Sequence, residues 1–80
     1  MTVKEGINIL LIKSGLTQEE LAHALGLKSR SAISVPLSRN KGMGMRVETL
    51  IRWLDKLDAD LVIQPREGEV MDEILLDGEE

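Results

Sequence analysis

Basic side chains that stand apart from any acid are the residues of this chain best suited to binding chemistry. Residues 21–47 contain no Asp or Glu, although the whole chain of 80 residues has a net charge of -4. The basic residues in that stretch are Lys28, Arg30, Arg39, Lys41 and Arg46. A surface that lies against phosphates excludes carboxylates, so the stretch predicts contact with a polyanion such as DNA.

Other kinds of chemistry find little support. The chain has no cysteine, which excludes disulfides and thiolate metal sites. We see no nucleophile–base pair, metal-ligand set or phosphate-binding glycine loop, and therefore expect no enzyme activity, cofactor or metal. Trp53 is the only aromatic residue, so single-stranded nucleic acid has no stacking platform. With no signal-peptide pattern and no apolar run of 18 residues, we expect a soluble cytoplasmic protein.

Four helices in one domain would have to position these side chains. The pattern of apolar residues predicts a first helix over residues 3–14, with Val3, Ile7, Leu10 and Leu11 on one face and Gly15 as its end. A second helix opens at the capping box of Thr17 and Glu20, flanked by Leu16 and Leu21, and stops at Gly26.

The third and fourth helices follow the turn at Gly26. The third is expected over residues 29–39, where Pro36 should kink it or end its regular hydrogen bonding. Residues 40–44 are predicted to be a loop. The fourth helix is expected over residues 47–57, with Trp53 on the flank of an apolar stripe formed by Val47, Leu50, Ile51, Leu54 and Leu57.

The C-terminal quarter differs from the helical part. Residues 61–64 form a short β-branched run closed by Pro65, which predicts a strand. The strand needs a partner, either the segment 70–76 or the same strand of a second subunit. Residues 67–80 carry seven acids and no base, whereas residues 1–66 carry ten bases and seven acids, a net charge of +3. We therefore divide the chain into a domain of residues 1–66 and an acidic tail of residues 67–80.

Residues 16–33 resemble the helix-turn-helix of the Cro and phage-repressor family, also called lambda-repressor-like. The resemblance rests on the segments TQEELA at 17–22, LGL at 25–27 and SAIS at 31–34. The resemblance implies that Ala22 is the small residue where the two helices approach, that Gly26 makes the turn, and that Leu21, Leu25 and Ile33 form the buried corner. Two features depart from the pattern: one extra residue, Lys28 or Ser29, and Pro36 in the recognition helix.

The resemblance implies a mainly α, four-helix DNA-binding fold with a short C-terminal strand. The third helix would enter the major groove and read bases. Carried over from Ile33, the base-contacting residues would be Arg30, Ser31, Ser34 and Val35. The residues expected to hold the DNA backbone are Thr17, Gln18, Lys28, Ser29, Arg39, Asn40 and Lys41. Arginine reads guanine with a bidentate fork, and valine packs on a thymine methyl.

Such a protein is expected to be a transcriptional regulator, a repressor of phage or mobile-element type that occludes a promoter. One helix-turn-helix reads few base pairs, so a homodimer on a near-palindromic site is expected. We predict antiparallel strand pairing across the two-fold axis. The predicted interface residues are Trp53, Leu57, Leu61, Val62, Ile63 and Gln64.

A second interpretation is the antitoxin of a toxin–antitoxin pair. The segment 70–76, within the acidic tail, mixes apolar anchors with acids and could fold onto a basic protein partner. The two interpretations are compatible, because an antitoxin can also bind DNA.

Overall fold

The chain is mainly helical, in a computed structural model that describes residues 1–64 and 74–76. The described elements are α1 (Val3–Ser14), α2 (Gln18–Ala24), α3 (Ser31–Ser38), the short 3₁₀ helix η1 (Arg39–Gly42), α4 (Val47–Lys56), β1 (Leu61–Ile63) and β2 (Ile74–Leu76). The predicted boundary at residue 66 and most of the acidic tail lie outside the described residues.

Capping boxes start both N-terminal helices. In α2 the hydroxyl of Thr17 accepts a hydrogen bond from the backbone N–H of Glu20, whose carboxylate accepts one from the backbone N–H of Thr17. This confirms the capping box predicted at Thr17. The same reciprocal pair joins Thr2 and Glu5 at the start of α1, and it was missed although the T-x-x-E spacing is plain in the sequence.

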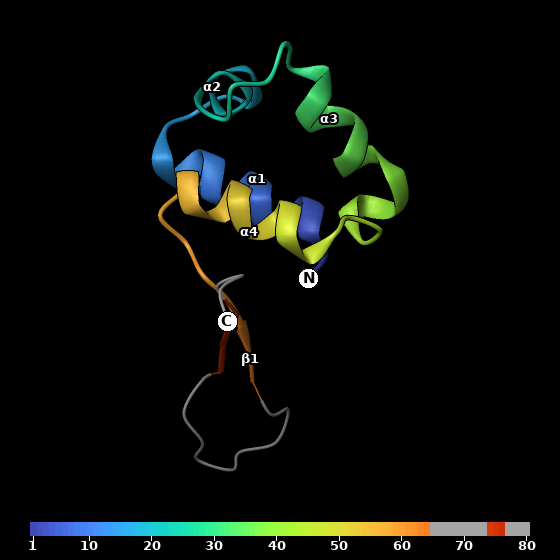
Figure 1. Cartoon of the computed structure of the whole chain (residues 1–80), viewed down its shortest axis with the longest axis vertical. Helices are drawn as coiled ribbons and strands as arrows, with labels where there is room; N and C mark the ends of the chain where they lie inside the picture. The colour runs from blue at the N-terminus through green and yellow to red at the C-terminus, as the bar shows by residue number, and fades with distance from the viewer. Residues whose placement is uncertain (65–73, 77–80) are drawn as a thin grey trace.

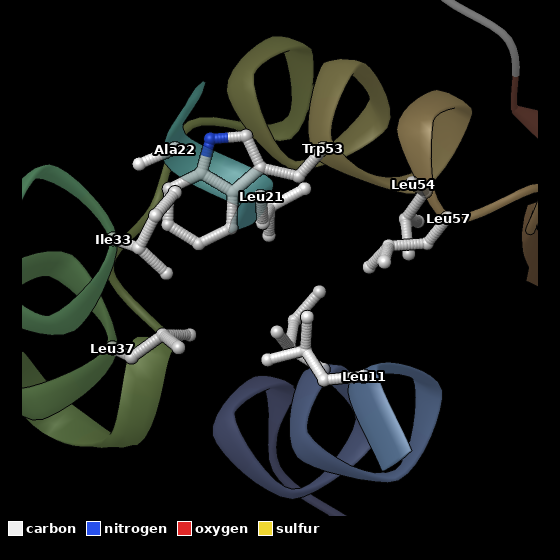
Figure 2. Close-up of a cluster of buried hydrophobic side chains, with 9 residues drawn as sticks. Leu11, Leu21, Ala22, Ile33, Leu37, Trp53, Leu54 and Leu57 are labelled. Carbon is white, nitrogen blue, oxygen red and sulfur yellow. The ribbon is translucent and has the colours of Figure 1, made fainter. Parts of the chain in front are cut away.

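One apolar core joins the four α-helices (Figure 2). Its buried members are Ile7, Leu11, Leu21, Ala22, Ile33, Leu37, Trp53, Leu54 and Leu57, which come from α1 to α4 and the residue after α4. The expected inner face of α1 is confirmed at Ile7 and Leu11. In α4 the expected stripe is wrong at Val47, which is 54% exposed in the first turn.

The indole of Trp53 belongs to this core. Figure 2 shows it reaching from α4 toward Ala22 of α2 and Ile33 of α3. Only 3% of Trp53 and 5% of Leu57 are exposed, so both are core residues of the single chain, whereas they were predicted at a dimer interface. The reason is tertiary: the helices α2 and α3 pack over this end of α4, which no local pattern in α4 reports.

Pro36 does not end its helix. Helix α3 continues through it to Ser38, whose hydroxyl donates to the carbonyl of Ser34 at 2.8 Å. Proline lacks an N–H and so leaves the carbonyl of Ala32 without its usual helical donor. The helix has only two more residues, which limits the consequence to this last turn. The regular α-helix ends at Ser38, and the backbone of Arg39 directly after it is extended (ψ 116°).

The segment expected to be a loop instead contains the tight turn η1. Asn40, Lys41 and Gly42 all have positive φ, at 47°, 54° and 79°. Gly42 is buried against α1 and α3, because a Cβ added there would lie 3.0 Å from the Cβ of Val3 and 3.3 Å from a methyl of Leu37. A glycine is therefore required at this position both by the backbone and by the available space.

The two strands form an antiparallel ladder within one chain. Leu61 pairs with Leu76, Val62 with Leu75 and Ile63 with Ile74. Of the two partners considered for the strand at 61–64, the later segment of the same chain is the one observed. Figure 1 shows this hairpin leaving the helices at the end opposite the turn between α2 and α3.

Candidate nucleic-acid interface

The acid-free stretch becomes one continuous region of the fold. Helix α2, the turn after it, α3 and η1 form an arc over the top and right of Figure 1, with α1 and α4 below. We call the exposed side chains of the turn, α3 and η1 the basic arc. It includes four exposed bases: Lys28, Arg30, Arg39 and Lys41. Arg46, the fifth base of the stretch, is also exposed, directly before α4.

The turn between α2 and α3 is built by backbone hydrogen bonds. The N–H of Gly26 donates to the carbonyl of His23, and the N–H of Leu27 donates to that of Ala22 at 2.9 Å. Gly26 adopts a φ of 73°, the left-handed conformation that commonly ends a helix. The predicted roles of Gly26 as the turn and Ala22 as a buried contact are thus confirmed. Leu25, predicted to belong to the buried corner, is partly buried and packs against the core.

Helix α3 has one buried face and one exposed face, and the exposed face belongs to the basic arc. Ile33 and Leu37 point into the core and are almost fully buried, which fixes the rotation of the helix. On the other side Ser31 is exposed, Ser34 is half-buried and Val35 is 45% exposed. The structure therefore brings the four predicted base-contacting residues, including Arg30 directly before the helix, to accessible positions on one short element.

Arg30 also makes a contact that the sequence did not reveal. Its Nε donates to the side-chain oxygen of Gln18 at 3.5 Å, and so connects the start of α3 to the start of α2. Thr17, Gln18, Glu19 and Arg30 line one shallow hollow. Arg30, predicted to read bases, and Gln18, predicted to contact the DNA backbone, therefore lie together. They are twelve positions apart in the sequence, so no local pattern predicts their contact.

The start of α3 has no side-chain cap on its backbone. Arg30 occupies the cap position with helical dihedral angles and no capping hydrogen bond. The hydroxyls of Ser29 and Ser31 are instead hydrogen bonded to one another at 2.7 Å, and both residues are exposed. The first turn of α3 thus places two hydroxyls and one guanidinium at the solvent side, all of which can donate to phosphate oxygens or base edges.

The other residues predicted to hold the DNA backbone divide between the two ends of the arc. Thr17, Lys28 and Ser29 are exposed beside the starts of α2 and α3. Arg39, Asn40 and Lys41 are exposed in η1, after the far end of α3. The positive φ of Asn40 and Lys41 belongs to the tight turn that carries their side chains.

Within the part of the chain that the structure describes, no carboxylate forms an ion pair with a base of the basic arc. By contrast, Arg52 in α4 pairs with Glu48 at 3.4 Å. Glu19 is the one acidic residue that lines the same hollow as Arg30. Unpaired, exposed bases keep their full attraction for phosphates.

The described residues show neither a metal centre nor a membrane-spanning helix. The described residues contain no group of three His, Cys, Asp or Glu side chains that could hold a metal ion. In the same part of the chain, the helices are too short or too polar to cross a membrane. Comparison with known proteins adds nothing to the site, since no family model, curated protein or solved structure matches the chain.

Proposed function

We propose that the chain is a sequence-specific DNA-binding regulator of the lambda-repressor-like type, in which α2 and α3 form the helix-turn-helix. The observation that carries the proposal is the basic arc: Lys28 and Arg30 lie in the turn before α3 and Arg39 and Lys41 in η1 after it, within an acid-free stretch whose bases form no ion pair with the described carboxylates. A helix of this size fits the major groove, and its first residues meet the base edges.

The roles of the arc residues follow from their chemistry and position. Arg30 has five donors in a planar fork, which suits the O6 and N7 atoms of guanine. The Nε of Arg30 donates a hydrogen bond to the side-chain oxygen of Gln18, which restricts the guanidinium. The two terminal nitrogens of Arg30 stay available for DNA. Val35 offers an apolar contact to a thymine methyl. The bases of the turn and of η1 flank α3 and would hold phosphates on both sides of it.

Repression by occlusion is the simplest use of such a domain. A protein that covers a promoter needs a surface that binds DNA and no catalytic group. An antitoxin would use the same arc, but its partner-binding segment lies mostly outside the described residues. The antitoxin interpretation therefore stays a prediction. An adjacent gene that encodes a small, basic, ribonuclease-like protein would favour it.

The test is fluorescence anisotropy of the purified chain on labelled DNA from directly upstream of its own coding sequence, with scrambled competitor, at two salt concentrations. We expect binding that resists the competitor, weakens as salt rises and is lost in Arg30→Ala. Arg52→Ala is the matched control, since Arg52 is an exposed arginine in α4 outside the arc. Equal affinity for scrambled DNA, or equal effects of the two substitutions, would contradict base reading by α3.

A further inference from the structure

An apolar groove between α1, α4 and β1 has no part in the proposed function. It has a volume of about 360 Å³, which is within the range of ligand-binding clefts, and Ile7, Leu10, Leu50 and Leu54 are among its lining residues. None of the bases of the basic arc lines this groove. The hairpin beside it leaves the helices at the end opposite the turn between α2 and α3 (Figure 1). A partner in the groove would therefore leave the arc free for DNA.

Gly6 lines the groove from inside α1, and its backbone does not require a glycine. Its φ is not positive, and an interior helical position is more stable with alanine than with glycine. Among the described residues, an added Cβ would meet only the Sδ of Met1, at 3.7 Å, which is an ordinary contact. The described chain thus has room for a side chain that the sequence omits. Glycine at such a position allows another backbone to approach closely.

The strand β1 offers backbone hydrogen-bonding groups beside this groove. In the described part of the chain it pairs with β2 along one edge, and its other edge has no strand partner. Successive residues of a strand point to opposite faces, and both Leu61 and Val62 line the groove, so the groove follows the strand itself. An open edge of this kind pairs with an extended segment of another chain. The occupant that fits is therefore an extended peptide segment.

A single charge determines which segment fits best. Asp60, directly before β1, is the only ionisable side chain among the residues that line the groove. It is exposed and forms no ion pair with any described base. A basic side chain of the occupant would be attracted by this carboxylate, whereas an acidic one would be repelled. In an antiparallel pair the carboxyl end of the added strand lies beside the start of β1, so the basic residue belongs at that end.

We propose that the groove binds an extended segment of a different protein, with aliphatic side chains at alternate positions and a basic residue at its carboxyl end. The segment pairs antiparallel with the free edge of β1, places its aliphatic side chains in the groove and passes close to Gly6. This inference goes beyond the proposed function and does not depend on it. It also differs from the antitoxin interpretation, in which a segment of this chain folds onto its partner.

The test is an NMR titration of the isotope-labelled full chain, without DNA, with two hexapeptides blocked at both ends. Both have valine at alternate positions and threonine between, and they differ only in a lysine or a glutamate at the carboxyl end. We expect the lysine peptide to shift the amide signals of β1 and Gly6 and to bind about 5-fold tighter than the glutamate peptide. Asp60→Lys should reverse this preference. Asp55→Lys, at an exposed acid of α4 outside the groove, is the matched control and should keep it.

A substitution at Gly6 separates binding from folding. Gly6→Ala should raise the thermal midpoint of unfolding by about 4–8 °C, because alanine is the better helix former. The same variant should bind the lysine peptide about 10-fold more weakly, since the new methyl overpacks the path of the added backbone. Gly44→Ala, outside the groove, is the control and should bind the peptide like the wild type.

Several results would overturn the proposal. They are an absence of saturable binding by the lysine peptide, equal affinity for the two peptides, and undiminished binding in Gly6→Ala. If the amide signals of the groove instead shifted with protein concentration alone, the occupant would be a second copy of the chain and not a different protein. Because DNA is absent from these measurements, a failure of DNA binding would refute the proposed function and leave this inference intact.

Discussion

Gly42 offers the sharpest test of how the helices are held together. Alanine at this position meets two separate penalties. Its φ of 79° is left-handed, which is unfavourable for an L-residue by about 1–2 kcal/mol. The new methyl also lies 3.0 Å from two atoms of Val3 and 3.3 Å from Leu37, an overpacking that typically destabilises by about 1–3 kcal/mol. We expect Gly42→Ala to lower the free energy of unfolding by about 2–5 kcal/mol.

The expected loss is a large part of the total free energy of unfolding. A domain of 80 residues has a total stability of roughly 4–12 kcal/mol. Urea unfolding followed by Trp53 fluorescence is the suitable assay, because this single indole is buried in the core and becomes solvated on unfolding. With a denaturant dependence of about 1 kcal/mol per molar urea, the midpoint should fall by about 2 M or more.

Two other glycines separate the two penalties. Gly26 has a φ of 73° but nothing within 4 Å of an added Cβ, so Gly26→Ala should show the backbone penalty alone, about 1–2 kcal/mol. Gly44 has neither a positive φ nor a neighbour, so Gly44→Ala should be neutral, or stabilising by up to about 1 kcal/mol. If Gly42→Ala were no more destabilising than Gly26→Ala, the claimed close packing of η1 on α1 would be refuted.

Three further predictions concern caps, the core and phosphate contacts. Thr2→Ala removes the side-chain acceptor of the α1 cap and should destabilise by about 1 kcal/mol in the same urea assay, whereas Thr49→Ala, in the interior of α4, should have a smaller effect. Trp53→Ala should cost about 3–5 kcal/mol, measured by thermal unfolding followed by circular dichroism; a variant within 1 kcal/mol of the wild type would contradict its role in the core. Lys41→Ala should reduce the salt dependence of DNA binding by about one unit of slope, while Lys56→Ala in α4 should leave it unchanged.

A fifth prediction concerns acid stability. The backbone N–H and the hydroxyl of Thr2 lower the pKa of the Glu5 carboxyl below its ordinary value of 4.5. A lowered folded-state pKa means that ionised Glu5 stabilises the fold, fully above its ordinary pKa, and that this stabilisation is lost as pH falls below 4.5. Glu5→Gln should therefore flatten the decline of the thermal midpoint with acid. An unchanged decline would show that the cap contributes nothing through its charge.

Local signals in the sequence were sufficient for most of the helices. The capping box at Thr17, the turn glycine at Gly26 and the apolar spacing of α1 each act within four or five residues, and the structure has all three as predicted. The acid-free run of residues 21–47 is also visible in the sequence without knowledge of the fold. It carries the prediction that this surface faces phosphates, because charge composition is read directly from the residues.

The placement of individual side chains was decided by the tertiary structure. Trp53 was expected at an edge or interface, but α2 and α3 cover it, and only their packing on α4 could show this. The hydrogen bond from Arg30 to Gln18 joins the starts of two helices whose relation depends on the turn.

The pairing of β1 was likewise only partly predictable from the sequence. The residues of a single strand indicate that it needs a neighbour, since unpaired backbone groups are unfavourable. They do not indicate which neighbour, because strand pairing depends on which segments the fold brings to the same edge. The sequence by itself therefore determined the helices, their caps and the charge of the candidate surface. Tertiary packing decided the burial of Trp53, the strained turn at Gly42 and the partner of β1, because each of these depends on contacts between residues far apart in the chain.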